Sequence, residues 1–431
     1  MQLISTNLTR KLYFFLFIII LVSLPYKHTN VINSTSIILC GLIWILEWKW
    51  AEKWLKIKTS PLILIFISLF LLYVLGLLYS ANVKNGFVII ERLLPLMVFP
   101  LIIGSTTNPL TKKQIEIIAW AFVGSIFIAT TICLIHALYY YFYKSSSEFL
   151  FHDPFCRVFL DITAIYLSVH VGFCMLWITD YILRNNLKII KKSLLITLIL
   201  FFLIILFFLN IRTALSTLLL IYLSGILIYF QYKKQLLKGL LLAGACLVLF
   251  FIVILIIPTT REKFFETINL EESIKLNANE DHSLGKVWGG RAIRVAIWQS
   301  AFDLAKDNLL FGVGTGDVQD QLQITYRKNG FLFASEYNRY NAHNQYIETL
   351  LAVGLLGLSI LLASFIYPIT ISLKRKDFLY LAFIIYVAAN CLTETLLGRQ
   401  KGAVFFGLIN ALLFFQYYNS KNNENHTTPT N

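Results

Sequence analysis

Runs of consecutive apolar residues constrain this chain more than any other feature of its sequence. Several of them reach the roughly 20 residues that a helix needs to cross a bilayer core about 30 Å thick. Only 14% of the residues are charged, whereas an ordinary soluble domain contains about 25%. The runs predict an all-α, polytopic integral membrane protein with about twelve transmembrane helices, near residues 12–26, 31–47, 61–79, 88–104, 115–143, 160–182, 193–210, 212–230, 239–257, 344–372, 378–396 and 402–418.

The net charge of +14 fits either nucleic-acid binding or basic residues held on the cytoplasmic side of membrane helices. With the N-terminus in the cytoplasm, the predicted inner segments contain about half of the 37 basic residues, as the positive-inside rule requires. The long outer loop balances its ten basic residues with eleven acidic ones and has no basic stripe. We therefore expect a lipid bilayer and no nucleic acid as partner.

The predicted topology divides the chain into four parts. These are an N-terminal bundle of about nine helices (1–257), a large water-exposed outer loop (258–343), about three further helices (344–418) and a polar, disordered cytoplasmic tail (419–431). Within the loop, apolar residues recur at helical spacing from Ile293 to Ala305. This pattern predicts an amphipathic helix over Arg291–Asp307 that lies against the outer membrane face.

Three arginines are placed where an anion could be bound. Arg212 lies in a short turn between two apolar runs, with no neighbouring acid; it is either an interfacial residue that reaches water or an anion ligand, and we favour the ligand. Arg291 and Arg294 are three residues apart and share a helix face, so they could present guanidinium forks to a phosphate or pyrophosphate. The alternative for this pair is a solvated helix face.

His343 precedes the apolar periodicity that follows the outer loop, in the segment NAHNQYIETLL. An imidazole can accept a proton near neutral pH, so His343 is a candidate general base, although a lone interfacial histidine is more often structural. Asn341 is positioned to cap the helix. Glu348 follows five residues later and either orients a partner or stabilises packing.

Two further arginines, Arg92 and Arg399, also fall on the outer side and are weaker candidates for binding an anionic head group. We expect Glu91 and Glu394 to pair with them. Three polar residues of another outer loop could shape a substrate entrance or simply reflect loop polarity: His152, Asp153 and Arg157.

The segment FGVGTGD contains Gly312, Gly314 and Gly316. It superficially resembles a nucleotide-binding loop, but the spacing is not GxGxxG and no strand precedes it. A turn that lets two backbones approach closely is the better interpretation.

No motif predicts a metal or another cofactor. The sequence has no HExxH, no DxD in the outer loop and no Walker loop, and its six cysteines are scattered without a CxxC pair. An enzyme with this layout must use a preactivated substrate that is already in the membrane.

The order of these features resembles the O-antigen ligase family and its polymerase relatives. The shared features are an arginine in a short outer turn, then R-x-x-R-x-x-x-W in a long outer loop (Arg291, Arg294, Trp298), G-x-G-x-G, and A-H-N-x-Y at the start of a helix. The resemblance covers roughly the C-terminal half, from Arg212 onward. One departure is the turn IRTA, which lacks the glycine that many relatives have after the arginine.

The resemblance implies a metal-independent, inverting glycosyltransferase of the bacterial inner membrane, with its active site facing the periplasm. Its donor would be a glycan on undecaprenyl pyrophosphate and its acceptor lipid A core oligosaccharide, as in lipopolysaccharide biosynthesis. By position, His343 corresponds to the catalytic base and Arg212 and Arg291 to the pair that binds the donor pyrophosphate. Arg294, Arg92, Arg399 and Glu348 are secondary candidates.

Three alternatives remain at the level of sequence. A polysaccharide polymerase or a protein O-oligosaccharyltransferase of the same superfamily would share these motifs. A polysaccharide transporter is disfavoured because transporters place ionisable residues near the bilayer midplane, whereas these candidates are predicted on one face.

Overall fold

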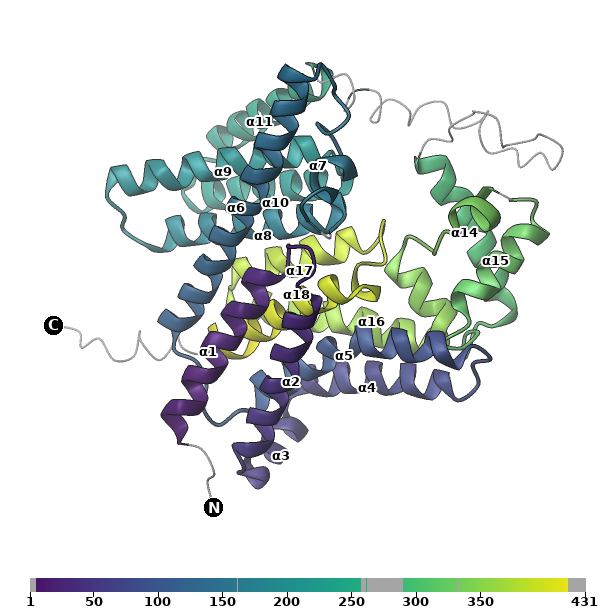
Figure 1. Cartoon of the computed structure of the whole chain (residues 1–431). Coiled ribbons are helices and arrows are strands. Elements are labelled where there is room, and N and C mark those ends of the chain that lie inside the picture. The colour runs from purple at the N-terminus through teal and green to yellow at the C-terminus, as the bar shows by residue number, and fades with distance from the viewer. Residues whose placement is uncertain (1–4, 161, 257–260, 262–289, 332, 418–431) are drawn as a thin grey trace.

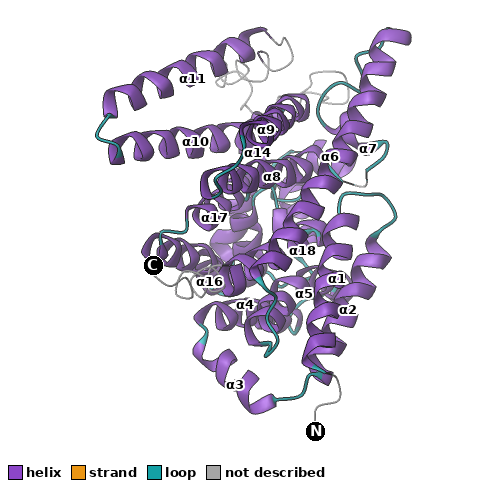
Figure 2. Ribbon diagram, turned by 90° about the vertical axis from the view of Figure 1, so that its left-hand side faces the viewer, coloured by secondary structure: helices purple, strands orange, loops and turns teal. Residues whose placement is uncertain are grey.

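The computed structural model describes residues 5–160, 162–256, 261, 290–331 and 333–417. These residues form helices and short connections (Figure 2). One isolated β-bridge joins Tyr26 and Leu160. The predicted tail 419–431 and most of the first part of the outer loop lie outside the described residues. The prediction of an all-α polytopic membrane protein is confirmed.

Each of the twelve predicted runs contains a helix. They are α1 (Thr6–Ser23), α2 (Asn30–Leu46), α4 (Pro61–Leu77), α5 (Val83–Ser105), α6 (Lys112–Tyr143), α8 (Ala164–Arg184), α9 (Ile189–Leu209), α10 (Arg212–Tyr232), α11 (Leu236–Ile256), α16 (Gln345–Arg375), α17 (Phe378–Asn390) and α18 (Gln400–Ala411). In the described part of the chain, eight helices are long and apolar enough to span a membrane, and α2 with the bent α3 (Trp50–Thr59) makes a ninth candidate. Because α4, α17 and α18 are shorter, the count of twelve stays a prediction.

The remaining elements lie in the connections or, for η3, directly after α18. They are α7 (Asp153–Arg157), α14 (Gly290–Asp307), α15 (Val318–Lys328), the π-helices η1 (Phe333–Asn338) and η3 (Leu412–Tyr417), and the 3-10 turn η2 (Leu396–Gly398). Figure 1 shows α14 and α15 beside the adjoining ends of α4, α5 and α16.

Helices α9 and α10 are separate although their apolar runs almost merge in the sequence. Asn210 ends α9 in the left-handed conformation, with φ 51°, which asparagine tolerates better than most residues. Ile211 then adopts an extended conformation and α10 begins at Arg212. The chain therefore reverses here, and the following connections keep the predicted order.

Alternate connections meet at the same end of the bundle, which we call the loop end because α14 and α15 lie there. Between the α6–α8 and α9–α10 connections, the His152 N–H donates to the Phe208 carbonyl at 2.9 Å. Between the α9–α10 and α17–α18 connections, the hydroxyl groups of Thr213 and Thr393 are 3.0 Å apart. Such contacts require neighbouring helices to run in opposite directions.

Several other connections lie at the opposite end. Glu47, after α2, accepts hydrogen bonds from Thr107 and from Asn108 after α5, and it forms a buried ion pair with Lys53 at 3.1 Å. Arg184, at the end of α8, lies 3.4 Å from Asp377, which precedes α17. This alternation agrees with the predicted order of crossings.

The glycine-rich turn packs backbone against backbone, as predicted. Gly312 has φ +72°, and a Cβ there would lie 2.4 Å from the Leu351 carbonyl oxygen of α16; Gly314 has φ +101°. Helix α16 is interrupted at Val353 and Gly354, which have non-helical backbone angles. The turn fills this interruption, because the Val313 N–H donates to the Leu351 carbonyl at 2.7 Å.

Helix α14 matches the predicted amphipathic segment. Four of its small or apolar residues are buried: Ala296, Ile297, Ala301 and Ala305. The helix packs against α15 and α16, so this apolar face is covered by protein. Its predicted placement on the membrane face stays a prediction.

Candidate active site

His343 lies in the turn that leads into α16. Its φ of 44° is left-handed, and its backbone N–H donates to Asn341 Oδ1 at 3.2 Å. Asn341 Nδ2 in turn donates to Thr395 Oγ1 at 2.8 Å. The predicted cap is wrong by three residues, since Asn344 caps α16 by accepting from the Tyr346 and Ile347 N–H groups. Asn341 instead shapes the turn that carries His343.

The imidazole of His343 is paired with a carboxylate. His343 Nδ1 lies 3.2 Å from Glu394 Oε2, and Glu394 is nearly buried in the α17–α18 connection. The expected pairing of Glu394 with Arg399 is therefore replaced by a hydrogen bond to His343. The His343 side chain keeps 26% of its surface exposed, so a substrate can reach it.

Glu394 is held in its ionised form. Burial raises the pKa of Glu394, but the hydrogen bond and charge of His343, with the charges of Arg294 and Arg399, outweigh burial and leave this pKa below its usual value. An ionised carboxylate only accepts hydrogen bonds. In the neutral imidazole, Nδ1 therefore carries the proton and Nε2 has a free lone pair.

Arg294 brings a cation from the loop to this pair. It lies on α14, where burial lowers its pKa and the charge of Glu394 raises it in part. The helix is fixed to the histidine turn by Trp298, whose Nε1 donates to the Ala342 carbonyl at 3.0 Å. The R-x-x-R-x-x-x-W segment and the A-H-N segment thus meet in space.

Arg212 is brought to the same connection by a different helix. It is the first residue of α10, and the adjacent Thr213 contacts Thr393, which precedes Glu394. Arg291 lies in the first turn of α14, three residues before Arg294, and its side chain lies outside the described residues. Both elements that carry these arginines approach the His343–Glu394 pair.

Glu348 supports the histidine turn from inside α16. Its Oε2 accepts the Ala342 N–H at 3.3 Å, which corresponds to the orienting role considered for it. Gln345 Oε1 accepts the Leu397 and Gly398 N–H groups at 2.9 and 3.1 Å, so the start of α16 also fixes the end of the α17–α18 connection.

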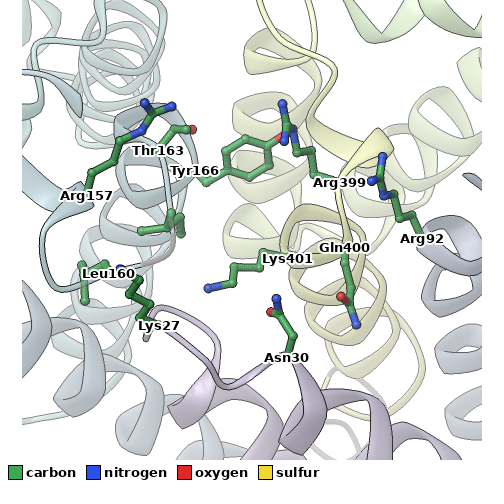
Figure 3. A pocket seen from close by; sticks show the side chains of 11 residues that line it. Lys27, Asn30, Arg92, Arg157, Leu160, Thr163, Tyr166, Arg399, Gln400 and Lys401 are labelled. Atoms are coloured by element: carbon green, nitrogen blue, oxygen red, sulfur yellow. The ribbon is translucent and has the colours of Figure 1, made fainter. Parts of the chain in front are cut away.

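A cationic cavity of about 460 Å³ opens beside the start of α18 (Figure 3). Five of its described lining residues are basic: Lys27, Arg92, Arg157, Arg399 and Lys401. Arg92 and Arg399, two of the predicted sites, thus belong to one cavity. It adjoins the histidine turn through Tyr166, a lining residue whose hydroxyl donates to the Thr395 carbonyl at 3.2 Å.

Several residues of this site were missed by reasoning from the sequence. The sequence pairs Glu394 with Arg399 and gives no sign of its contact with His343, although an acid at the end of an apolar run indicates a special role. Lys27, Tyr166 and Lys401 come from three distant segments, and no local pattern distinguishes them.

No group of three histidine, cysteine or acidic side chains that could hold a metal ion is found among the described residues. The guanidinium groups of Arg294 and Arg399 act electrostatically on Glu394. The arrangement suits the removal of a proton beside a bound anion.

The fold and this site define a polytopic helical membrane protein with a histidine–carboxylate pair beside arginines at one end of its bundle. Residues 196–362 match the model of the family described as O-antigen ligase. This match confirms the resemblance and includes Arg212, Arg291, Arg294 and His343. It indicates a membrane enzyme of the O-antigen ligase and polymerase type. No curated protein matches the chain.

Proposed function

We propose that the protein is a metal-independent, inverting O-antigen ligase-like glycosyltransferase. It transfers a glycan from undecaprenyl pyrophosphate to an acceptor hydroxyl of lipid A core oligosaccharide, at the periplasmic face of the bacterial inner membrane. The observation that carries this proposal is the 3.2 Å contact between His343 Nδ1 and Glu394 Oε2, because it leaves Nε2 free to act as a base.

His343 is the general base of this reaction. Nε2 takes the proton of the acceptor hydroxyl as that oxygen forms its bond to the anomeric carbon of the donor glycan. Glu394 stabilises the imidazolium that results, and it fixes the ring orientation. The bond between the anomeric carbon and the pyrophosphate oxygen breaks with its electron pair moving to that oxygen.

The arginines stabilise the departing pyrophosphate. Arg212 and Arg291 bind its oxygens, because planar guanidinium groups match phosphate oxygens in pairs. Arg294, close to Glu394, keeps the local potential positive. Charge stabilisation on one side and a base on the other are what this displacement needs.

The alternatives differ in their acceptor. A polymerase would extend carrier-linked repeat units, so its deletion would leave single repeats, whereas deletion of a ligase would leave long carrier-linked glycan. A protein O-oligosaccharyltransferase would produce glycoprotein. The family match of residues 196–362 agrees with a ligase and with a polymerase, and the deletion phenotype distinguishes the two.

The test is transfer by purified, reconstituted protein supplied with carrier-linked glycan and lipid A core. We expect His343→Asn, Arg212→Gln and Arg291→Gln each to reduce transfer strongly, and EDTA to have no effect. Full transfer by all three variants would show that the proposed site is wrong.

A further inference from the structure

The cationic cavity is built from parts of the chain other than those that carry the arginines of the transfer step. The arginines assigned to the donor pyrophosphate come from α10 and α14. The cavity is lined instead from the α1–α2 connection, α5, the α7–α8 segment and the start of α18. No described residue of α10 or α14 lines it.

The charge of the cavity is strong and only partly compensated. None of its described lining residues is acidic, although Asp161, between two of them, lies outside the described residues. Arg157 is paired with Asp153 at 3.5 Å. Among the described residues, no carboxylate lies within ion-pair distance of Lys27 or Arg92. A concave site of this charge attracts a polyanion.

The cavity also communicates with the catalytic pair. Arg399 lines it and acts electrostatically on Glu394, and Tyr166 joins its wall to Thr395. Its volume of about 460 Å³ is in the range that accepts a small ligand or a sugar phosphate. Figure 3 shows Lys27, Arg157 and Lys401 around one part of the opening, with Arg92 and Arg399 on another.

A two-substrate transferase needs the donor and the acceptor on different sides of its base. We propose that the cavity binds a phosphate-bearing group of the acceptor glycolipid, while Arg212 and Arg291 hold the donor pyrophosphate; this inference rests on the proposed function. The preferred acceptor is therefore a phosphorylated glycan whose free hydroxyl reaches His343.

The experiment compares the wild-type chain with the double variant Lys27→Gln/Arg92→Gln. Each is reconstituted with undecaprenyl-pyrophosphate glycan and with lipid A core, either intact or dephosphorylated beforehand. Lys84→Gln is the control, because Lys84 is an exposed residue of α5 outside the cavity lining.

We expect the acceptor KM of the double variant to rise by about tenfold for each cation removed, since each charge-assisted contact has roughly that effect. The rise should appear with the intact acceptor, shrink with added salt and vanish with the dephosphorylated acceptor. The donor KM should not change, and Lys84→Gln should behave as wild type.

A rise in the donor KM would overturn the inference and make the cavity a donor subsite. An unchanged acceptor KM would overturn it as well. If the wild-type chain transfers nothing, the proposed function fails, and equilibrium binding of intact lipid A core to the chain in nanodiscs then decides. Weaker binding by the double variant would support the cavity as an acceptor site, and equal binding would refute it.

Discussion

His343 Nδ1 and Glu394 Oε2 lie 3.2 Å apart although 51 positions separate the two residues in the sequence. The histidine precedes α16 and the glutamate follows α17, so the pair forms only when this helical hairpin closes. The Gln345 N–H, which donates to the Cys391 carbonyl at 2.8 Å, fixes that closure.

Replacing Glu394 with glutamine should lower the transfer rate by roughly 10- to 100-fold, the usual effect of losing a carboxylate that orients a histidine. Glutamine retains the shape but no longer fixes the tautomer or stabilises the imidazolium. Initial rates at saturating substrates measure the effect. Glu91→Gln, at an exposed position of α5, is the control; equal rates for both variants would remove Glu394 from the mechanism.

His343→Asn should lower kcat by about 10²- to 10⁴-fold, the usual contribution of a general base. Asparagine is chosen because it tolerates the left-handed backbone at this position. His28, with φ 60°, offers a matched control, and His28→Asn should retain activity. Similar losses in the two variants would indicate a general effect on the fold.

Arg212→Lys should lower kcat/KM for the donor by about tenfold to a hundredfold, because the charge remains but the paired hydrogen bonds to phosphate oxygens are lost. Steady-state kinetics with varied donor concentration measure this loss. Arg327→Lys, at an exposed position of α15, should leave the kinetics unchanged. If Arg212→Lys has the same donor kcat/KM as the wild type, Arg212 does not make paired hydrogen bonds to the pyrophosphate.

Arg294→Gln should shift the acid limb of the pH–rate profile to higher pH. The charge of Arg294 helps to hold the pKa of Glu394 below its usual value, so the stabilisation from the ionised carboxylate is present above the usual pKa and is lost as the pH falls through the lowered one. Removing the cation raises the pKa of Glu394, so activity is lost earlier on acidification. An unmoved or acid-shifted limb, measured as kcat/KM against pH, contradicts this electrostatic coupling.

Gly312→Ala should destabilise the protein by about 1–3 kcal/mol or more, because a non-glycine residue is strained at positive φ and the new Cβ meets the Leu351 carbonyl oxygen. Thermal unfolding in detergent measures the change. Gly124→Ala is the control, since that helical position in α6 has open space around it. Equal melting temperatures for the two variants would mean that the turn does not need this close approach.

Much of the fold follows from the length of the apolar runs, since a helix that crosses lipid must be long and uninterrupted by charge. The reversal at Asn210 and the burial of Ile297 follow from local turn chemistry and helical period. The sequence does not predict the break at Gly354, because the segment there is apolar on both sides and only its contact with the glycine-rich turn reveals it.

The sequence predicts a residue of the candidate site only where the local segment has a recognisable pattern. Arg294 and His343 stand out beside turn or cap patterns, whereas the pairing of Glu394 with His343 depends on how α16 and α17 meet. The sequence offers both Asn341 and Asn344 near the start of α16, and only the backbone geometry selects Asn344 as the cap. The cavity is lined by residues that lie hundreds of positions apart in the sequence, such as Lys27 and Lys401, so no local pattern predicts it.

At the interruption of α16, residues 309–316 supply hydrogen-bond partners that this helix lacks. The Leu351 and Ala352 carbonyls receive N–H groups from Val313 and Gly314, and the Leu355 N–H donates back to Leu309. Residues 309–316 therefore cannot be exchanged between homologues on their own. A chimaera that exchanges residues 309–316 must also exchange the matching turn of α16. Otherwise the backbone groups of the recipient helix at this turn lose their hydrogen-bond partners.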